Sequence, residues 1–191
     1  MPPVFTAGHS TRPIEDLLAL LAEHGVRTLV DVRRFPGSRR HPQYSRDALA
    51  ASLAAAGIQY VHEPDLGGRR AARPDSPHTA WRVEAFRGYA DYMETPEFQA
   101  ALERLIQRAE GQAEGQTVAI LCAEAVPWRC HRRLISDALV ARGVQVMHIM
   151  GPGRADPHEL DANARLLPGG KLLYAGPEDP QPSLFADAPE T

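Results

Sequence analysis

The chain has 191 residues, of which 43% are hydrophobic, 6% are aromatic and 24% are charged, and its formal net charge is −3 at pH 7. This length suits a single domain with its own core, and the composition excludes a disordered polymer or a uniformly basic nucleic-acid coat. Two cysteines cannot form a disulfide framework, and without a signal peptide or an apolar run of about 18 residues we expect a cytoplasmic protein without membrane contact.

Short apolar runs alternate with segments of helical periodicity. Strands are predicted at 3–7, 27–32, 58–62, 117–122 and 144–150, and helices at about 14–24, 46–56, 80–93, 96–110 and 130–142. Near-continuous apolar strands joined by helices indicate a parallel sheet covered on both faces. The predicted fold is therefore α/β, a Rossmann-like, doubly wound three-layer sandwich with a mainly parallel five-stranded sheet.

One α/β domain is predicted for residues 1–176, followed by a flexible, Pro-rich and acidic tail at 177–191. Beyond residue 151 we expect little more than a helical turn and a short edge strand. The loop EPDLGGRRAARPDSPHT, residues 63–79, is too long for a simple connection, so we expect it to be functional or mobile.

Polar side chains follow each predicted strand. Because the carboxyl ends of parallel strands meet at one edge of a sheet, where ligands of such folds bind, these side chains are expected to converge. The residues concerned are His9, Ser10, Asp31, Arg33, His62, Glu63, Cys122, Glu124 and His148.

Four spaced motifs carry a family resemblance: GHS at 8–10, DVRRFPGSRR at 31–40, Tyr60 with LGG at 66–68, and LCAE at 121–124 with CHR at 130–132. Together they resemble the family called domain of unknown function 488, over about residues 4–151. The resemblance implies a compact α/β fold, a shared site at the strand ends and an association with DNA repair or nucleotide chemistry. It implies no particular reaction.

The two cysteines allow three interpretations. Zinc ligands usually come in close pairs, and neighbours such as Cys130 and His131 diverge by about 100° on a helix, so a structural zinc held by Cys122, Cys130 and His131 is a minority expectation and no cofactor is predicted. Alternatively, Cys122 precedes a helix and could be a low-pKa nucleophile for sulfur or phosphoryl transfer. Either cysteine could also simply pack in the core.

The favoured interpretation is a carboxylate beside arginines, which suits cleavage or transfer on a phosphate-bearing substrate. Glu124 is the leading catalytic residue, Asp31 and His9 assist it, and Cys122 shapes or joins the site. The alternative is that Asp31 or Glu124 forms a structural ion pair with a neighbouring arginine. Residues expected to bind phosphate or substrate are Ser10, Arg33, Arg39, Gly67, Gly68, Arg69, His131 and Arg132, with the two glycines providing a positive-φ turn.

The tail contains QPSLF, residues 181–185, which resembles the bacterial sliding-clamp-binding pentapeptide Q-x-[SD]-L-F. In such peptides a leucine and a phenylalanine, here Leu184 and Phe185, enter an apolar groove while the glutamine, here Gln181, fixes the register. Alternatively, the apolar pair folds back onto the domain.

The sequence thus predicts an enzyme, a hydrolase or transferase that acts on a nucleotide or nucleic acid in DNA maintenance and is recruited by the sliding clamp. Two alternatives remain open. One is a Cys122-dependent sulfur- or phosphoryl-transfer enzyme, and the other is a non-catalytic nucleic-acid-binding adaptor.

Overall fold

A computed structural model describes residues 1–37 and 39–176, so the clamp-like motif lies outside the described residues. Its main sheet has six strands in the order β3-β2-β4-β1-β5-β6. Five are parallel: β1 (Val4–Gly8), β2 (Val26–Asp31), β3 (Gln59–His62), β4 (Thr117–Cys122) and β5 (Val146–Gly151). The sixth, β6 (Arg154–Pro157), pairs antiparallel with β5 at one edge.

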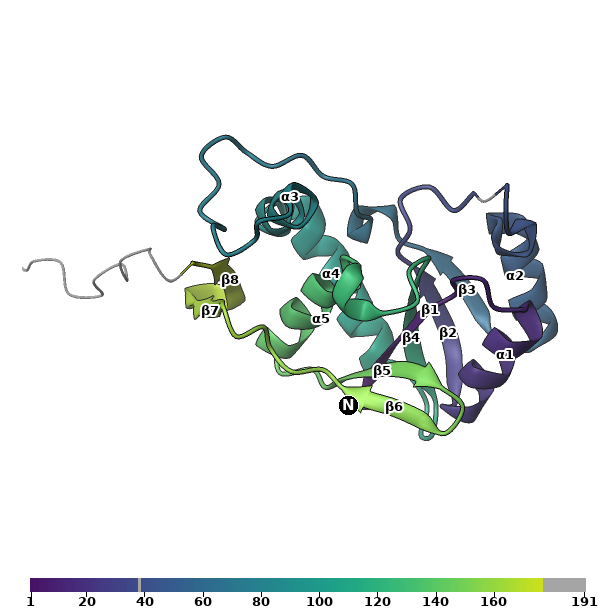
Figure 1. Cartoon of the computed structure of the whole chain (residues 1–191). Helices are drawn as coiled ribbons and strands as arrows, with labels where there is room; N and C mark the ends of the chain where they lie inside the picture. The colour runs from purple at the N-terminus through teal and green to yellow at the C-terminus, as the bar shows by residue number, and fades with distance from the viewer. Residues whose placement is uncertain (38, 177–191) are drawn as a thin grey trace, which may run out of the picture.

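Helices cover both faces of this sheet (Figure 1). On one face α1 (Ile14–Glu23) and α2 (Arg46–Ala55) bury Leu17, Leu21, Leu49 and Leu53 against the strands. On the other lie α3 (Glu84–Met93), α4 (Pro96–Glu110) and α5 (Arg132–Ala141), whose buried side chains include Phe98, Leu102 and Leu134. The apolar runs at β2 and β4 are buried because both faces are covered, and the predicted Rossmann-like three-layer fold is confirmed.

The strand order indicates where a ligand-binding crevice of this sheet should lie. From β1 the chain crosses over β4 to reach β2, and from β4 it crosses over β1 in the opposite direction to reach β5. The two connections leave for opposite faces of the sheet, since α1 packs on one face and α5 on the other, and they diverge at the ends of the adjacent strands β1 and β4, whose last residues Gly8 and Cys122 stand in register. In doubly wound sheets this divergence opens a crevice at the carboxyl ends of the strands.

The part after residue 151 contains more structure than the sequence indicated. The β5–β6 hairpin turns at a Pro-Gly pair, where Gly153 has φ +66. A second sheet pairs β7 (Ala164–Leu167) with β8 (Lys171–Tyr174), and a 3-10 turn at Pro168–Gly170 joins them. Both hairpins turn at Pro-Gly dipeptides, Pro152-Gly153 and Pro168-Gly169, which are turn signals in the sequence.

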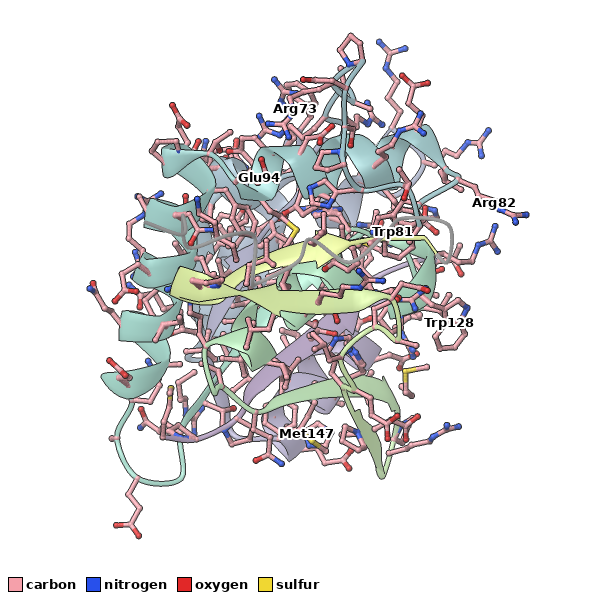
Figure 2. All side chains as sticks on the ribbon, turned by 90° about the vertical axis from the view of Figure 1, so that its left-hand side faces the viewer. Arg73, Trp81, Arg82, Glu94, Trp128 and Met147 are labelled. Atoms are coloured by element: carbon pink, nitrogen blue, oxygen red, sulfur yellow. The ribbon has the colours of Figure 1, made fainter. Side chains whose placement is uncertain are left out.

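The long loop after the 3-10 turn at Pro64–Leu66 is anchored to the helices and to β8. Arg73 pairs with Glu94 at 3.0 Å, and the ring of Trp81 lies 5.4 Å from that of Tyr174. Figure 2 shows Trp81 beside the small sheet, with Arg73 and Glu94 on the helical side above it. Within the described residues, no helix is long and apolar enough to cross a membrane.

Candidate functional site

A cleft of about 720 Å³ lies at the carboxyl ends of β1, β2 and β4. Eight of the predicted site residues line it, namely His9, Ser10, Arg33, Gly68, Arg69, Cys122, Glu124 and His131. Four other predicted site residues in the described part of the chain do not line the cleft: Asp31, Arg39, Gly67 and Arg132. The topology therefore brings most of the predicted set to one place.

Asp31 is fully buried and serves Arg33 instead of facing the cleft. Its carboxylate accepts from Arg33 Nε at 2.8 Å, Arg33 Nη2 at 2.6 Å and the Arg33 backbone N–H at 3.1 Å. The hydroxyl of Tyr60 donates to the same carboxylate at 2.8 Å. Asp31 is thus a positioning residue, in the ion-paired arrangement that the sequence analysis kept as its alternative.

His9 is held as a neutral ring. Its Nδ1 lies 3.0 Å from the Ser10 carbonyl oxygen and its Nε2 lies 3.3 Å from Arg33 Nη1, so the first nitrogen donates and the second accepts. Burial lowers the pKa of His9 to about 4, and the Arg33 guanidinium acts in the same direction. The ring also stacks on Tyr44. His9 therefore carries no proton to donate from Nε2 at neutral pH.

The backbone N–H groups of His9 and Ser10, in the GHS turn, are hydrogen-bonded within the protein. The N–H groups of His9 and Ser10 donate to the carbonyls of Cys122 and Ala123, which ties β1 to β4. Ser10 and Arg69 are the only non-glycine residues with positive φ in the described part of the chain, at +45 and +62. Both line the cleft, and strained backbone of this kind concentrates at functional sites.

The LGG segment differs from its predicted role. Neither Gly67 nor Gly68 has a positive φ. The residue of this turn with a positive φ is Arg69. The glycines are required by close packing: a Cβ at Gly67 would lie 2.8 Å from the Arg34 Cβ, and one at Gly68 would lie 2.9 Å from His131 Nδ1. The loop therefore presses directly on the His131 ring.

Arg132 is a buried structural cation, with 1% of its surface exposed. Its Nη2 donates to the Glu124 carbonyl at 2.6 Å and its Nη1 to the Thr6 hydroxyl at 3.2 Å, while its Nε has no partner among the described residues. It fixes the loop that carries Glu124 and does not reach the cleft, so phosphate binding by Arg132 is not supported by its placement.

Cys122, Cys130 and His131 form a compact cluster whose ligand atoms all lie within 4.8 Å of one another. Cys130 has extended backbone, with φ −136 and ψ 150, and α5 begins only at Arg132. The expected divergence of Cys130 and His131 on a helix was therefore wrong. Within the pair of thiols, the hydrogen bond from Cys122 lowers the pKa of Cys130, whereas the pairing and burial raise that of Cys122.

Glu124 is exposed in the cleft, and its carboxylate has no hydrogen bond or ion pair with any residue that the structure describes. The same holds for the side chains of Arg69 and Arg129. Sequence reasoning missed Arg34, Phe35, His41, Val83 and Arg129 as cleft residues. Arg34 and Phe35 lie inside the DVRRFPGSRR motif, so that signal was available, whereas Val83 reaches the cleft only through the packing of the long loop.

His148 does not line the cleft, and it lies inside β5 (Val146–Gly151) and not at the end of the strand, where the sequence predicted it. It joins a buried chain of hydrogen bonds that runs from Thr6 (2.7 Å) through His148 to His158 (2.9 Å) and on to Asp137 (2.8 Å). Burial lowers the pKa of His148 to about 3, with His158 and Arg132 adding to the effect. This chain stabilises the contact between β1, β5 and α5.

The fold and the cleft define a doubly wound α/β protein with a basic strand-end site and a cluster of two thiols and an imidazole. Within this class, the chain belongs to the family described as Domain of unknown function DUF488, whose family model matches residues 13–139. No curated protein and no solved structure matches the chain.

Proposed function

We propose that the cleft binds a nucleotide or a nucleic acid through its phosphates, and that the protein is an enzyme in which Glu124 is the catalytic carboxylate. The observation that carries this proposal is the charge of the cleft. Of the residues that the structure describes, four arginines and one carboxylate, that of Glu124, line it, in a chain whose net charge is −3. One guanidinium group can donate two parallel hydrogen bonds to two oxygens of a phosphate. A local excess of arginine therefore favours a phosphate-bearing ligand.

The four arginines have different parts in this proposal. Arg33 has five N–H donors, of which four already bind Asp31, Tyr44 and His9, so it offers one donor and a fixed positive charge. Arg69 and Arg129 are exposed and unpaired in the described part of the chain, and both can reorient around a phosphate. Arg34 already donates to the Arg69 carbonyl at 3.0 Å. Phosphate contacts are therefore assigned mainly to Arg69 and Arg129.

Exposed apolar side chains beside the arginines support a ligand that also carries a base. Phe35 is 66% exposed and Val83 is 55% exposed, and both line the cleft. Trp128, also 55% exposed, lies next to Arg129 and points outward at the edge of the molecule in Figure 2. Stacking of a base on an aromatic ring contributes about 1–3 kcal/mol of binding free energy per base. Exposed Phe35 could therefore contact the base of a nucleotide, whereas a phosphate ion without a base would not stack on it.

Glu124 is the candidate to act on the bound substrate because its carboxylate has no partner among the described residues. A carboxylate in such a site either attacks a sugar carbon or activates a water, which makes a hydrolase or a transferase the expected class. Asp31 and His9 serve it indirectly, through the orientation of Arg33. Loss of turnover with retained binding in Glu124→Gln would support this role, measured over a panel of nucleotides and damaged oligonucleotides. If Glu124→Gln kept every activity of the wild type, the role would be refuted.

Binding is tested by fluorescence anisotropy with a labelled single-stranded oligonucleotide. Arg69→Ala and Arg129→Ala should each weaken binding and reduce the slope of log K against log salt by about 0.7, the value for one phosphate contact on a single strand. Arg27→Ala is the matched control, because Arg27 is exposed at the amino end of β2, away from the cleft. Equal effects of all three substitutions would contradict the proposal.

Recruitment by the sliding clamp is part of the proposal and is supported by QPSLF alone. Titration of labelled full-length protein with purified bacterial clamp should show binding that is lost in the Leu184→Ala/Phe185→Ala variant. The double variant Leu166→Ala/Leu167→Ala removes another exposed apolar pair, in β7, and should bind as the wild type does. If no form bound, DNA as the site of action would lose its main support.

A second candidate function is thiol catalysis, and one observation favours it. Cys130 lies at the start of α5, where the Arg132 backbone N–H points to its Sγ at 3.5 Å, and its pKa is the lowered one of the pair. A sulfur- or phosphoryl-transfer enzyme would then use Cys130 as the nucleophile in place of Cys122, the residue that the sequence predicted, because the pKa of Cys122 is raised by its pairing with Cys130 and by burial. Loss of turnover in Cys130→Ser with activity kept in Glu124→Gln would select this function. Ligand binding without any turnover would instead indicate the adaptor.

A further inference from the structure

The cluster at the floor of the cleft has the dimensions of a metal site. His131 Nδ1 lies 3.6 Å from Cys130 Sγ and 3.9 Å from Cys122 Sγ. Around a tetrahedral zinc, with bonds of about 2.0–2.1 Å to nitrogen and about 2.3 Å to sulfur, a nitrogen and a sulfur ligand stand about 3.6 Å apart. We propose that Cys122, Cys130 and His131 bind one Zn²⁺ ion whose fourth position faces the cleft.

Groups behind the three ligands orient them in the way that metal ligands require. His131 Nε2 lies 3.1 Å from the Val32 carbonyl oxygen, so Nε2 carries the proton and the lone pair of Nδ1 points to the sulfurs. A backbone carbonyl on the far nitrogen is the usual support of a metal-binding histidine. The Arg132 backbone N–H supports Cys130 Sγ from the protein side at 3.5 Å.

The ligands come from rigid backbone, so the site is formed in advance. Cys122 ends β4, Cys130 lies between a 3-10 turn and α5, and His131 is the N-cap of α5. Gly68 leaves the space beside the imidazole open, because a Cβ there would lie 2.9 Å from His131 Nδ1. A side chain at Gly68 would stand over the face of the imidazole, since its Cβ would also lie 3.2 and 3.3 Å from the Cγ and Cε1 of His131, and it would force the ring to shift.

The fourth position is available to a water or a substrate oxygen. All three ligand residues line the cleft, and no fourth histidine, cysteine or carboxylate joins the cluster within the described residues. Structural zinc sites are closed by four protein ligands, whereas catalytic sites have three and an open position. Such an ion would supply a Lewis acid and a bound water of lowered pKa, in a cleft where Glu124 is the only carboxylate among residues 1–37 and 39–176.

Ligand chemistry selects the metal. Two thiolates and an imidazole are soft donors that favour zinc over magnesium or calcium, which take oxygen ligands. Two thiolates with Zn²⁺ also form a neutral unit, which suits cysteines that are only 6% and 4% exposed. The inference rests on the proposed function only for the identity of the substrate. Metal binding is measured without substrate, so either proposal can fail without the other.

Cobalt is the first probe. Full-length protein is reduced, stripped with a chelator and titrated with Co²⁺, then with Zn²⁺. We expect one equivalent per chain, thiolate-to-cobalt charge-transfer absorption with tetrahedral visible bands, and displacement of Co²⁺ by Zn²⁺ but not by Mg²⁺. Metal should also protect both thiols from alkylation and raise the Tm, since it binds only the folded state.

Variants locate the site. Cys122→Ser, Cys130→Ser and His131→Gln should each weaken Co²⁺ binding by more than about 100-fold, because loss of a ligand exceeds the 10–100-fold effect of losing a supporting group. Gly68→Ala should weaken it by shifting the His131 ring. His24→Gln is the control, since His24 is the C-cap of α1, far from the cleft.

Two results would overturn the inference. One is a wild-type protein that binds no Co²⁺ or Zn²⁺ while both thiols are reduced and remain open to alkylation. The other is binding at full affinity after loss of either cysteine, which would place the metal elsewhere. The first result is measured on the wild-type protein and the second on single variants, and neither measurement depends on catalysis. A variant that fails to fold therefore leaves the first result available as a test.

Discussion

The Asp31–Arg33 ion pair should be the polar interaction on which the cleft depends most. Asp31→Asn keeps the size of the side chain but removes its charge and turns one acceptor into a donor. The guanidinium of Arg33, only 7% exposed, would then face an amide in place of a carboxylate that accepts two of its N–H groups. A buried cation would be left without its counter-charge.

The size of the effect follows from this burial. Removal of one partner of a buried ion pair costs about 3–5 kcal/mol. At about 2–4 °C per kcal/mol for a chain of this length, the Tm should fall by about 6–20 °C. Urea unfolding at pH 7 gives the free energy directly. Asp156→Asn is the matched control, because Asp156 forms an exposed pair with Arg154 and its loss should leave the urea midpoint unchanged.

A double-mutant cycle with Arg33→Gln measures the coupling between the two side chains. If the two side chains act as one unit, the double variant loses clearly less free energy than the sum of the single losses. A loss below about 1 kcal/mol in Asp31→Asn, or strict additivity, would show that the pair behaves as a solvent-screened surface pair and does not hold Arg33 in place.

Two further predictions concern the packing beneath the cleft. In Gly8→Ala the new Cβ would overlap the Glu124 carbonyl, so the substitution should lower the free energy of unfolding by about 1–3 kcal/mol and abolish turnover. Gly151→Ala, with no atom within 4 Å of the new Cβ, should change neither quantity. Unfolding and activity assays measure both. His148 has a folded pKa of about 3 against 6.5 in the unfolded chain, so its contribution to stability is complete above pH 6.5 and is lost as the pH falls toward 3. The free energy of unfolding, measured with urea between pH 7 and 5, should therefore depend less on pH in His148→Gln than in the wild type, by up to about 1.4 kcal/mol per pH unit. An equal pH dependence in the two proteins would contradict the buried neutral ring.

The sequence predicts the fold because its strands and helices differ in period and length. Near-continuous apolar runs such as TVAILC, in β4, can only be buried on both faces, and the helices between them follow from capping residues such as Thr95, whose hydroxyl accepts from the Phe98 backbone N–H. The β7–β8 sheet escaped prediction because its strands are only four residues each and because Leu166 and Leu167, in β7, are exposed.

The site was predictable in place but not in detail. That His9, Arg33, Cys122 and Glu124 meet follows from parallel strands ending at one edge. Which carboxylate is free does not follow, because the difference between Asp31 and Glu124 depends on the rotamer of Arg33 and on the hydroxyl of Tyr60. The thiol–imidazole cluster depends on one extended residue, Cys130, which helical periodicity assigned to a helix.

We propose above all that the strand-end cleft binds a phosphate-bearing ligand. The most direct measurement is a ¹⁵N amide chemical-shift titration of the full-length protein with a mononucleotide and with a short single-stranded oligonucleotide. We expect saturable shifts at cleft residues such as Ser10, Gly68 and Glu124, and none at Arg27 or Thr117 at the opposite ends of the strands. Shifts confined to the opposite edge, or none with either ligand, would contradict the account.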